Sequence, residues 1–207
     1  MKTVSVFFAI AMASTLAITS CNQSKPVNTI KNLKGGIIGE TTASAKYEAF
    51  AKHAREEGYD TIAILFDAAS KAEAIHAANH KKVLEGLGEI MENFDPQFEV
   101  KTTAESLKAA IEGESYEVAT MYPKFLEEAK AEKVEKAVKS FTWALDTEKK
   151  HNEFYSKALS ALEANSETNL PVGFAVCPVC GNTYDLANLD DKCAFCQTGK
   201  EKYISFN

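Results

Sequence analysis

The hydrophobic positions of the chain recur at helical spacing in four long segments. Between residues 62 and 87 the positions of one stripe are separated by steps of four and three residues, which is the period of a helix that buries one face. Three further segments show a similar period. Together with the breaker residues between them, these segments predict helices over residues 29–57, 61–93, 102–130 and 132–164.

Helix-capping and helix-breaking residues support these boundaries. Asp60 is a good N-cap for the second helix, and Thr102 with Glu105 forms a capping-box pattern at the start of the third. Pro123 lies inside the third helix and is expected to kink it. Residues 93–101 contain an Asp-Pro pair, so we expect them to break the helices and to form one long crossover.

The apolar face of the second segment is interrupted by polar residues. Glu73, His76 and His80 fall on the stripe between Ala69 and Val83. A glutamate is almost never buried without a partner, because an isolated buried carboxylate is neutralised or expelled. A metal ion would supply the missing positive charge, and residues three apart share a helix face, so Glu73 and His76 can bind one ion together. A single Glu-x-x-His pattern, however, often arises by chance.

The same interruption recurs in the other three segments. Glu148 and His151 repeat the Glu-x-x-His pattern in the fourth segment. The first and third segments carry carboxylates on or beside their apolar stripes, at Glu40, Glu114 and Glu117. Four helices that each direct a carboxylate into the core are typical of di-metal sites in ferritin-like four-helix bundles. The predicted fold is therefore mainly α.

The last part of the chain carries a different metal-binding pattern. Cys177 and Cys180 are followed, after twelve intervening residues, by Cys193 and Cys196. Paired CxxC knuckles at this spacing hold one tetrahedral metal ion with four thiolates. So small a domain has too little core to fold unaided, and the metal would supply folding energy. Two disulfides are the alternative, which an exported location would favour.

The first twenty residues have the build of an export signal. Lys2 precedes an apolar run that is short for a transmembrane helix and ends in Ile18-Thr-Ser-Cys21, which resembles a bacterial lipobox. We therefore expect residues 1–20 to be a signal peptide, Cys21 to carry a lipid, and residues 21–28 to be a polar tether. An uncleaved N-terminal anchor or a mistaken start codon is the alternative.

These patterns divide the chain into domains and limit its partners. The bundle covers residues 29–164, a linker 165–173, and the four-Cys domain 174–207. The net charge of −6 argues against a nucleic-acid surface. We expect an exported, membrane-anchored lipoprotein, on the periplasmic side or in the cell envelope, that contacts the membrane only through its N-terminal lipid.

With both modules in view, the chain resembles rubrerythrin over nearly all of residues 29–207. The order of parts is the same, with a ferritin-like bundle first and a small rubredoxin-like β/loop domain at the C terminus. The strings that carry the resemblance are Gly39-Glu40 with Tyr47, Glu73-Ala-Ile-His76, Gly113-Glu114-Ser-Tyr-Glu117 with Met121-Tyr122-Pro123, Glu148-Lys-Lys-His151 and Cys177-Pro-Val-Cys180-Gly181.

The resemblance implies a di-iron site in the bundle and a single iron at the four cysteines. By motif match, Glu73 and Glu148 would bridge the two irons of the bundle. Glu40 and Glu114 would be terminal ligands, one to each iron. His151 would bind one of the two irons through its imidazole.

The resemblance also implies roles for residues around these ligands. Glu117 and His76 match the positions at which one family iron exchanges its ligand between oxidation states. Tyr47 and Tyr122 match tyrosines that hydrogen-bond the ligand carboxylates, although bundle core is an equally good interpretation of Tyr47. His80 has no counterpart in the motifs, and we expect it to be partly solvated rather than a ligand.

The chemistry implied by the resemblance is the reduction of hydrogen peroxide to water at the reduced di-iron pair, in defence against oxidative stress. The four-Cys iron would resupply electrons one at a time. In the family a head-to-tail homodimer brings that iron near the partner's di-iron site. An exported protein has no access to the cytoplasmic nicotinamide-linked donor, and the sequence does not identify the electron donor that replaces it.

The second cysteine knuckle departs from the family pattern. Gln197 follows Cys196 where the family has glycine, and it would be strained if the turn needs a positive φ. This departure leaves zinc as an alternative to iron, and zinc has no redox chemistry. With zinc there, the chain would be a ferroxidase or iron-handling lipoprotein. A structural or sensor protein with a damaged site is a further interpretation, but the complete ligand set argues against it.

Overall fold

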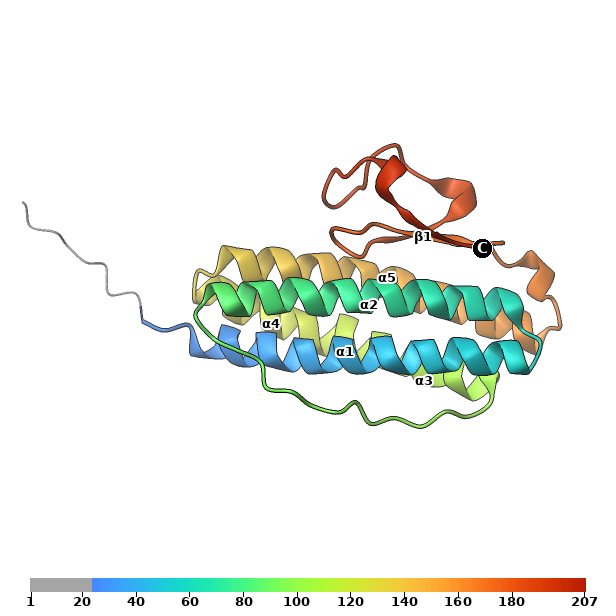
Figure 1. Ribbon diagram of the computed structural model, residues 1–207, viewed down its shortest axis with the longest axis horizontal. Helices are drawn as coiled ribbons and strands as arrows, with labels where there is room; N and C mark the ends of the chain where they lie inside the picture. Colours follow the sequence, from blue (N-terminus) through green and yellow to red (C-terminus); the bar gives the residue numbers. More distant parts are fainter. Residues whose placement is uncertain (1–23) are drawn as a thin grey trace, which may run out of the picture.

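The computed structural model describes residues 24–207 and shows a bundle of long helices with a small domain on one side (Figure 1). The predicted signal peptide and the lipidation site Cys21 lie outside the described residues. The helices of the bundle are α1 (Val27–Glu56), α2 (Asp60–Gly86), α3 (Thr103–Tyr116), the π-helix η1 (Glu117–Met121), α4 (Tyr122–Ala131) and α5 (Glu135–Glu163). Since α3, η1 and α4 follow one another without a break, they form the third of four long helices.

The connection after α2 begins earlier than the sequence predicted. The expected second helix ended at residue 93, but α2 ends at Gly86, and Gly88 has a φ of +80° that does not fit a right-handed helix. The chain then runs along the outside of the bundle to the start of α3 (Figure 1). This segment is the predicted long crossover. The predicted capping box of Thr102 and Glu105 is confirmed at the start of α3.

The third helix accommodates Pro123 through a change of helix type. Proline lacks an N–H, and its ring collides with the carbonyl group four residues earlier in a regular α-helix. In this chain the π-helix η1 lies directly before α4, and Pro123 occupies the first turn of α4. The wider π turn is a common insertion at functional sites. Here it begins at Glu117, one of the candidate ligands.

The bundle has two apolar cores with a polar layer between them. One core contains an aromatic cluster of Tyr47, Phe50, Phe66 and Tyr155. The other core is built around Leu33, Leu84, Tyr122 and Phe141. The buried carboxylates and imidazoles lie between these two groups along the helices, so the apolar cores hold the polar layer at mid-length.

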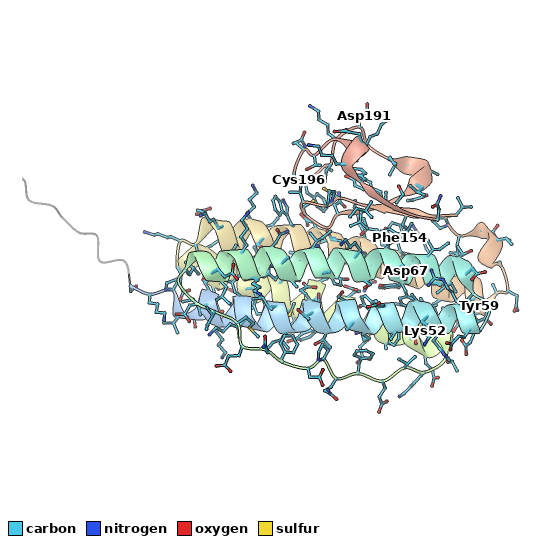
Figure 2. All side chains as sticks on the ribbon, viewed as in Figure 1. Lys52, Tyr59, Asp67, Phe154, Asp191 and Cys196 are labelled. Atoms are coloured by element: carbon cyan, nitrogen blue, oxygen red, sulfur yellow. The ribbon has the colours of Figure 1, made fainter. Side chains whose placement is uncertain are left out.

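The C-terminal domain forms a three-stranded antiparallel sheet in the order β2–β1–β3. Its strands are β1 (Phe174–Val176), β2 (Thr183–Asp185) and β3 (Ile204–Phe206). The domain contacts α2 and α5 (Figure 1), with Cys196 on the side of the bundle and Asp191 at the outer end (Figure 2). The predicted fold class, a ferritin-like bundle followed by a small strand-and-loop domain, is confirmed. Within residues 24–207, none of the helices has the length and apolar character needed to cross a membrane.

Candidate metal centre

Six candidate ligands meet in the polar layer at the centre of the bundle, and all six are buried. They come from α1, α2, α3 and α5, and their potential ligand atoms fall into two overlapping groups, each within 4.8 Å. Glu73 and Glu148 belong to both groups. The first group adds Glu40 and His76, and the second adds Glu114 and His151. Two carboxylates that belong to both groups, with one further carboxylate and one imidazole in each group, form the arrangement that a pair of bridged metal ions requires.

The Glu-x-x-His spacing accounts for the geometry on each side. His76 points its Nδ1 atom between the shared carboxylates, 3.0 Å from Glu73 Oε2 and 2.8 Å from Glu148 Oε1. His151 does the same from α5, with Nδ1 2.8 Å from Glu148 Oε2 and 3.1 Å from Glu73 Oε1. Because residues three apart share a helix face, each motif delivers one carboxylate and one imidazole to the same point.

The electrostatics of this layer favour bound cations. Burial, together with the neighbouring carboxylates, raises the pKa of Glu40 and of Glu114 well above the ordinary value. Burial alone would lower the pKa of His76, but the carboxylates of Glu148 and Glu73 outweigh it and raise this pKa to about 9. Within residues 24–207, Glu40 Oε2, Glu73 Oε1 and both oxygens of Glu148 are buried and have no partner with hydrogen-bond geometry. Metal ions would satisfy these oxygen atoms, so the residues present fit a di-metal site.

Two buried tyrosines hydrogen-bond the terminal carboxylates. The Tyr47 hydroxyl donates to Glu114 Oε1 at 2.7 Å, and the Tyr122 hydroxyl donates to Glu40 Oε1. Tyr47 also packs in the aromatic cluster, so it combines both roles that the sequence left open. Glu117 is only half-buried and belongs to neither ligand group. Burial, then the Glu148 carboxylate, raises the pKa of Glu117 well above its ordinary value.

His80 differs from the sequence-based expectation. We expected a partly solvated side chain, but His80 is completely buried. It lies one turn beyond His76 on the same helix face, and the ring of Phe141 packs against it. Its two nitrogens contact Ser140 and Tyr122. The sequence signal was present, because His80 falls on the apolar stripe of the second helix.

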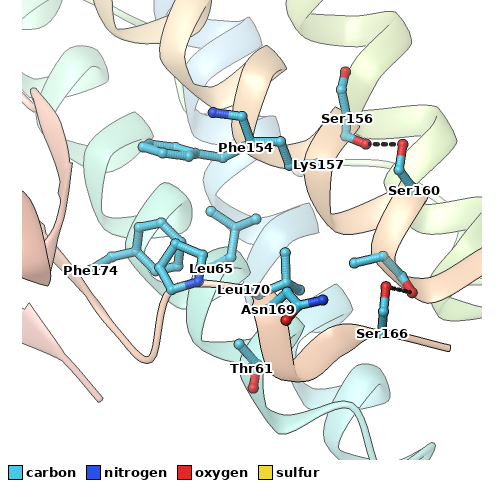
Figure 3. Close-up of a pocket in the computed structure, with 12 residues that line it drawn as sticks. Thr61, Leu65, Phe154, Ser156, Lys157, Ser160, Ser166, Asn169, Leu170 and Phe174 are labelled. Carbon is cyan, nitrogen blue, oxygen red and sulfur yellow. Dashed lines mark hydrogen bonds between the residues drawn. The ribbon is translucent and has the colours of Figure 1, made fainter. Parts of the chain in front are cut away.

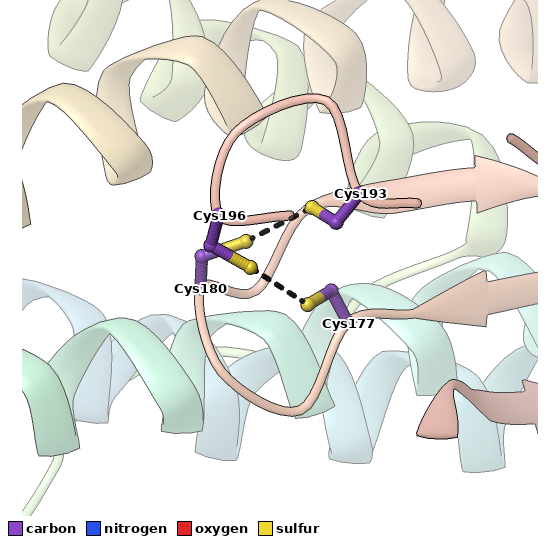
Figure 4. A group of neighbouring side chains, drawn as sticks. All are labelled: Cys177, Cys180, Cys193 and Cys196. Atoms are coloured by element: carbon purple, nitrogen blue, oxygen red, sulfur yellow. Dashed lines mark hydrogen bonds between the residues drawn. The ribbon is translucent and has the colours of Figure 1, made fainter. Parts of the chain in front are cut away.

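The four cysteines of the C-terminal domain form a second cluster (Figure 4). Their Sγ atoms all lie within 4.8 Å of one another, and the pairs Cys177–Cys196 and Cys180–Cys193 are 3.4 Å apart. All four are free thiols, which contradicts the alternative of two disulfides. A tetrahedral ion with bonds of about 2.3 Å to sulfur needs edges of roughly 3.8 Å, which these distances approach. Hydrogen bonding from Cys180 lowers the pKa of Cys177 to about 4, which favours a thiolate ligand.

The two knuckles of this cluster use different residues at the same turn position. Gly181, after the first knuckle, has a φ of +83°. Gln197, after the second, has a φ of +63°, so this turn does need a positive φ, and the strain considered from the sequence applies. The Gln197 side chain donates a hydrogen bond to the carbonyl of Cys193 at 3.2 Å, which fixes it in this conformation.

The first knuckle and the start of β2 lie against the two candidate imidazole ligands, His76 and His151. A Cβ atom on Gly181 would be 2.3 Å from His76 Nε2, so only glycine fits at this contact. His151 Nε2 is 2.9 Å from Thr183 Oγ1, and Thr183 in turn donates to the Gly181 carbonyl at 3.2 Å. The Thr183 oxygen therefore accepts from His151 Nε2–H, so in the neutral imidazole Nδ1 is the nitrogen that can bind a metal.

Further hydrogen bonds from Asn79 and Lys150 hold the C-terminal domain on the bundle. Asn79 Nδ2 on α2 donates to the Val179 carbonyl at 2.9 Å. Lys150 Nζ on α5 donates to Asn182 Oδ1 at 2.6 Å. These contacts and the role of Thr183 could not be predicted from the sequence, because they depend on how the two domains pack.

An apolar surface pocket lies between α2, α5 and the chain leading to β1 (Figure 3). Leu65, Phe154, Leu170 and Phe174 contribute to its lining. None of the candidate ligands lines this pocket, so it is separate from both metal clusters.

Fold and site together define a ferritin-like bundle with a paired carboxylate–histidine metal site, joined to a four-Cys domain. The rubrerythrin family model matches residues 31–159. Nigerythrin of Nitratidesulfovibrio vulgaris is 36% identical over 187 residues, covering 86% of this chain and 87% of nigerythrin. Rubrerythrin-2 of Clostridium acetobutylicum is 32% identical over 175 residues, covering 84% of this chain and 94% of that protein. The structure of fully reduced, all-ferrous nigerythrin matches with a TM-score of 0.77 and 31% identity, covering 100% of each chain.

The chain belongs to the rubrerythrin family. It carries the carboxylate–histidine cluster of the family's di-iron site and a four-Cys cluster consistent with a rubredoxin-like iron site.

Proposed function

We propose that the protein is a rubrerythrin-type peroxidase that reduces hydrogen peroxide in defence against oxidative stress. The observation that carries this proposal is the contact between the four-Cys domain and both imidazoles of the di-metal site. Gly181 lies against His76, and Thr183 accepts a hydrogen bond from His151. A one-electron metal site held this close to a two-electron site suits a reaction that consumes electrons in pairs.

The bundle provides two metal positions, each surrounded by buried carboxylate and imidazole side chains. When bound, a ferrous pair supplies two electrons and Lewis acidity, so that the O–O bond of hydrogen peroxide breaks and two protons complete two water molecules. Glu73 and Glu148 face both positions, and the tyrosine hydroxyls fix the two terminal carboxylates. Thr183 holds the tautomer of His151 that leaves its Nδ1 atom free.

We extend the proposal to an exchange of ligands between Glu117 and His76. In the structure the imidazole of His76 faces the metal position, whereas Glu117 lies outside both ligand groups. His76 Nε2 has no hydrogen-bond partner among residues 24–207, so the ring is held through Nδ1 and by packing against Gly181. Glu117 starts the π-helix η1, and a change in that turn would bring its carboxylate inward.

The proposal includes a homodimer and a membrane-side location. If two chains exchanged their C-terminal domains, Gly181 and Thr183 of one chain would contact the bundle of its partner. The result would be a head-to-tail dimer. A hybrid of one chain carrying Glu73→Ala and one carrying Cys196→Ser tests this arrangement, because it regains peroxide turnover only if electrons cross between chains. With Cys21 lipidated, the protein would be anchored to a membrane of the cell envelope, and its electron donor would be membrane-linked or periplasmic.

The proposal is tested with a form lacking residues 1–21, purified without oxygen and fully reduced. One equivalent of hydrogen peroxide is added, and the visible absorption of a ferric four-thiolate site is followed. We expect the colour to appear at once while peroxide is consumed, because electrons leave the four-Cys iron for the bundle. Absence of colour, with zinc found at the four cysteines, would overturn the peroxidase proposal and favour iron handling.

A further inference from the structure

His80 is a buried, polar residue that the proposed chemistry does not use. The structure places it between the metal layer and the core around Phe141, with its Nε2 atom 3.9 Å from Glu40 Oε1. A Cβ atom on Gly36 would be 2.9 Å from His80 Cδ2, so α1 approaches the ring closely at a glycine.

The hydrogen bonds around His80 run in one direction. A metal-bound carboxylate can only accept, so the hydroxyl hydrogen of Tyr122 is committed to Glu40. His80 Nε2, 3.1 Å from the Tyr122 oxygen, must then donate to it. A neutral imidazole has one N–H, so Nδ1 of His80 accepts the hydrogen of the Ser140 hydroxyl at 2.7 Å.

We propose that His80 is a positioning residue of the di-iron site. As the Nε2–H tautomer, it holds the Tyr122 hydroxyl so that its hydrogen points at Glu40. The chain of donors runs from Ser140 through His80 and Tyr122 to Glu40, and it sets the orientation of one terminal carboxylate.

The other half of the site offers a matched comparison. His80 lies four residues after His76, and Tyr155 lies four residues after His151. Tyr155 stands behind Tyr47 as His80 stands behind Tyr122, with a ring-centroid distance of 5.5 Å. The Tyr155 hydroxyl, however, has no hydrogen-bond partner among the described residues. Among the described residues, a hydrogen bond from an imidazole to the supporting tyrosine is therefore found on the Glu40 side. This inference concerns the metal site and does not require peroxide to be its substrate.

The test measures iron binding and Mössbauer spectra of the full reduced protein, with His80→Leu, His80→Gln and Tyr155→Phe as variants. In His80→Leu we expect about tenfold weaker binding of one iron in chelator competition, since loss of an outer hydrogen bond costs about 10–100-fold in metal affinity. Only one of the two bundle quadrupole doublets should shift. His80→Gln keeps an N–H donor near the Nε2 position and should bind within about twofold of wild type, and Tyr155→Phe should leave both irons unchanged.

A double variant separates positioning from general packing. If His80 acts through Tyr122, then His80→Leu should add nothing in a Tyr122→Phe background. Additive losses, or unchanged iron binding in His80→Leu, would overturn the proposal. If His80→Leu does not fold, Ser140→Ala tests the same series of hydrogen bonds from Ser140 to Glu40. It should shift the same doublet, and an unchanged spectrum would overturn the proposal.

Discussion

The two metal positions of the bundle are built on one plan but are supported differently. Each has a Glu-x-x-His motif, a terminal carboxylate and a tyrosine that donates to that carboxylate. The imidazoles differ in what lies behind them. His151 Nε2 bonds to Thr183, whereas His76 Nε2 lies against Gly181 and has no hydrogen-bond partner in the part of the chain that the structure describes.

This difference shows that the four-Cys domain orients the His151 imidazole by a hydrogen bond and makes only van der Waals contact with the His76 imidazole. A hydrogen bond to the distal nitrogen orients a histidine ligand and raises its basicity. His151 has that support and His76 lacks it. The position of His76 is therefore the one suited to ligand exchange, in agreement with the role we propose for Glu117.

The largest effect is expected from removing a carboxylate that both positions share. Glu73→Ala should reduce bundle iron to less than one per chain, while Glu40→Ala should reduce it to about one, because Glu40 belongs to one group only. Total iron per chain, less the one iron of the intact four-Cys site, measures this, and circular dichroism checks that the helices remain. Two irons retained in Glu73→Ala would show that our ligand assignment is wrong.

The second prediction concerns the contact at His76. Gly181→Ala places a Cβ within 2.3 Å of His76 Nε2 at a φ of +83°. Overpacking and the left-handed conformation together should cost about 2–4 kcal/mol in the free energy of unfolding. Urea unfolding measures the loss. An unchanged midpoint would mean that the four-Cys domain does not rest on His76 in solution.

The third prediction concerns the contact at His151. Thr183→Val keeps the shape but removes the hydroxyl that accepts from His151 Nε2. We expect about tenfold weaker iron binding at the His151 position and little change at the His76 position. Mössbauer spectroscopy of the reduced protein separates the two. Asn79→Ala, which removes a docking bond that does not involve Thr183 or His151, is the control. Equal effects of both variants would assign the change to docking rather than to His151.

The sequence predicted six residues that the bundle brings together as candidate ligands, because that information is periodic. Glu73 and His76 stand where a helix should bury apolar residues, and the same interruption recurs at Glu148 and His151. The contacts of Thr183 could not be predicted, because they depend on the angle at which one domain meets another. The environment of His80 was predicted wrongly, although its stripe position indicated burial, since the hydroxyl partners come from other helices.

The smallest effect is expected at the second knuckle, where the chain has Gln197 in place of a glycine. Gln197→Gly relieves a left-handed conformation that costs a non-glycine residue about 1–2 kcal/mol. It also gives up the hydrogen bond to the Cys193 carbonyl and increases the freedom of the unfolded chain by about 0.5–1 kcal/mol. These contributions nearly cancel, so the free energy of unfolding should change by less than about 1 kcal/mol. A loss as large as that of Gly181→Ala would show that both knuckles are held equally tightly, and that close contact with the bundle does not distinguish the first.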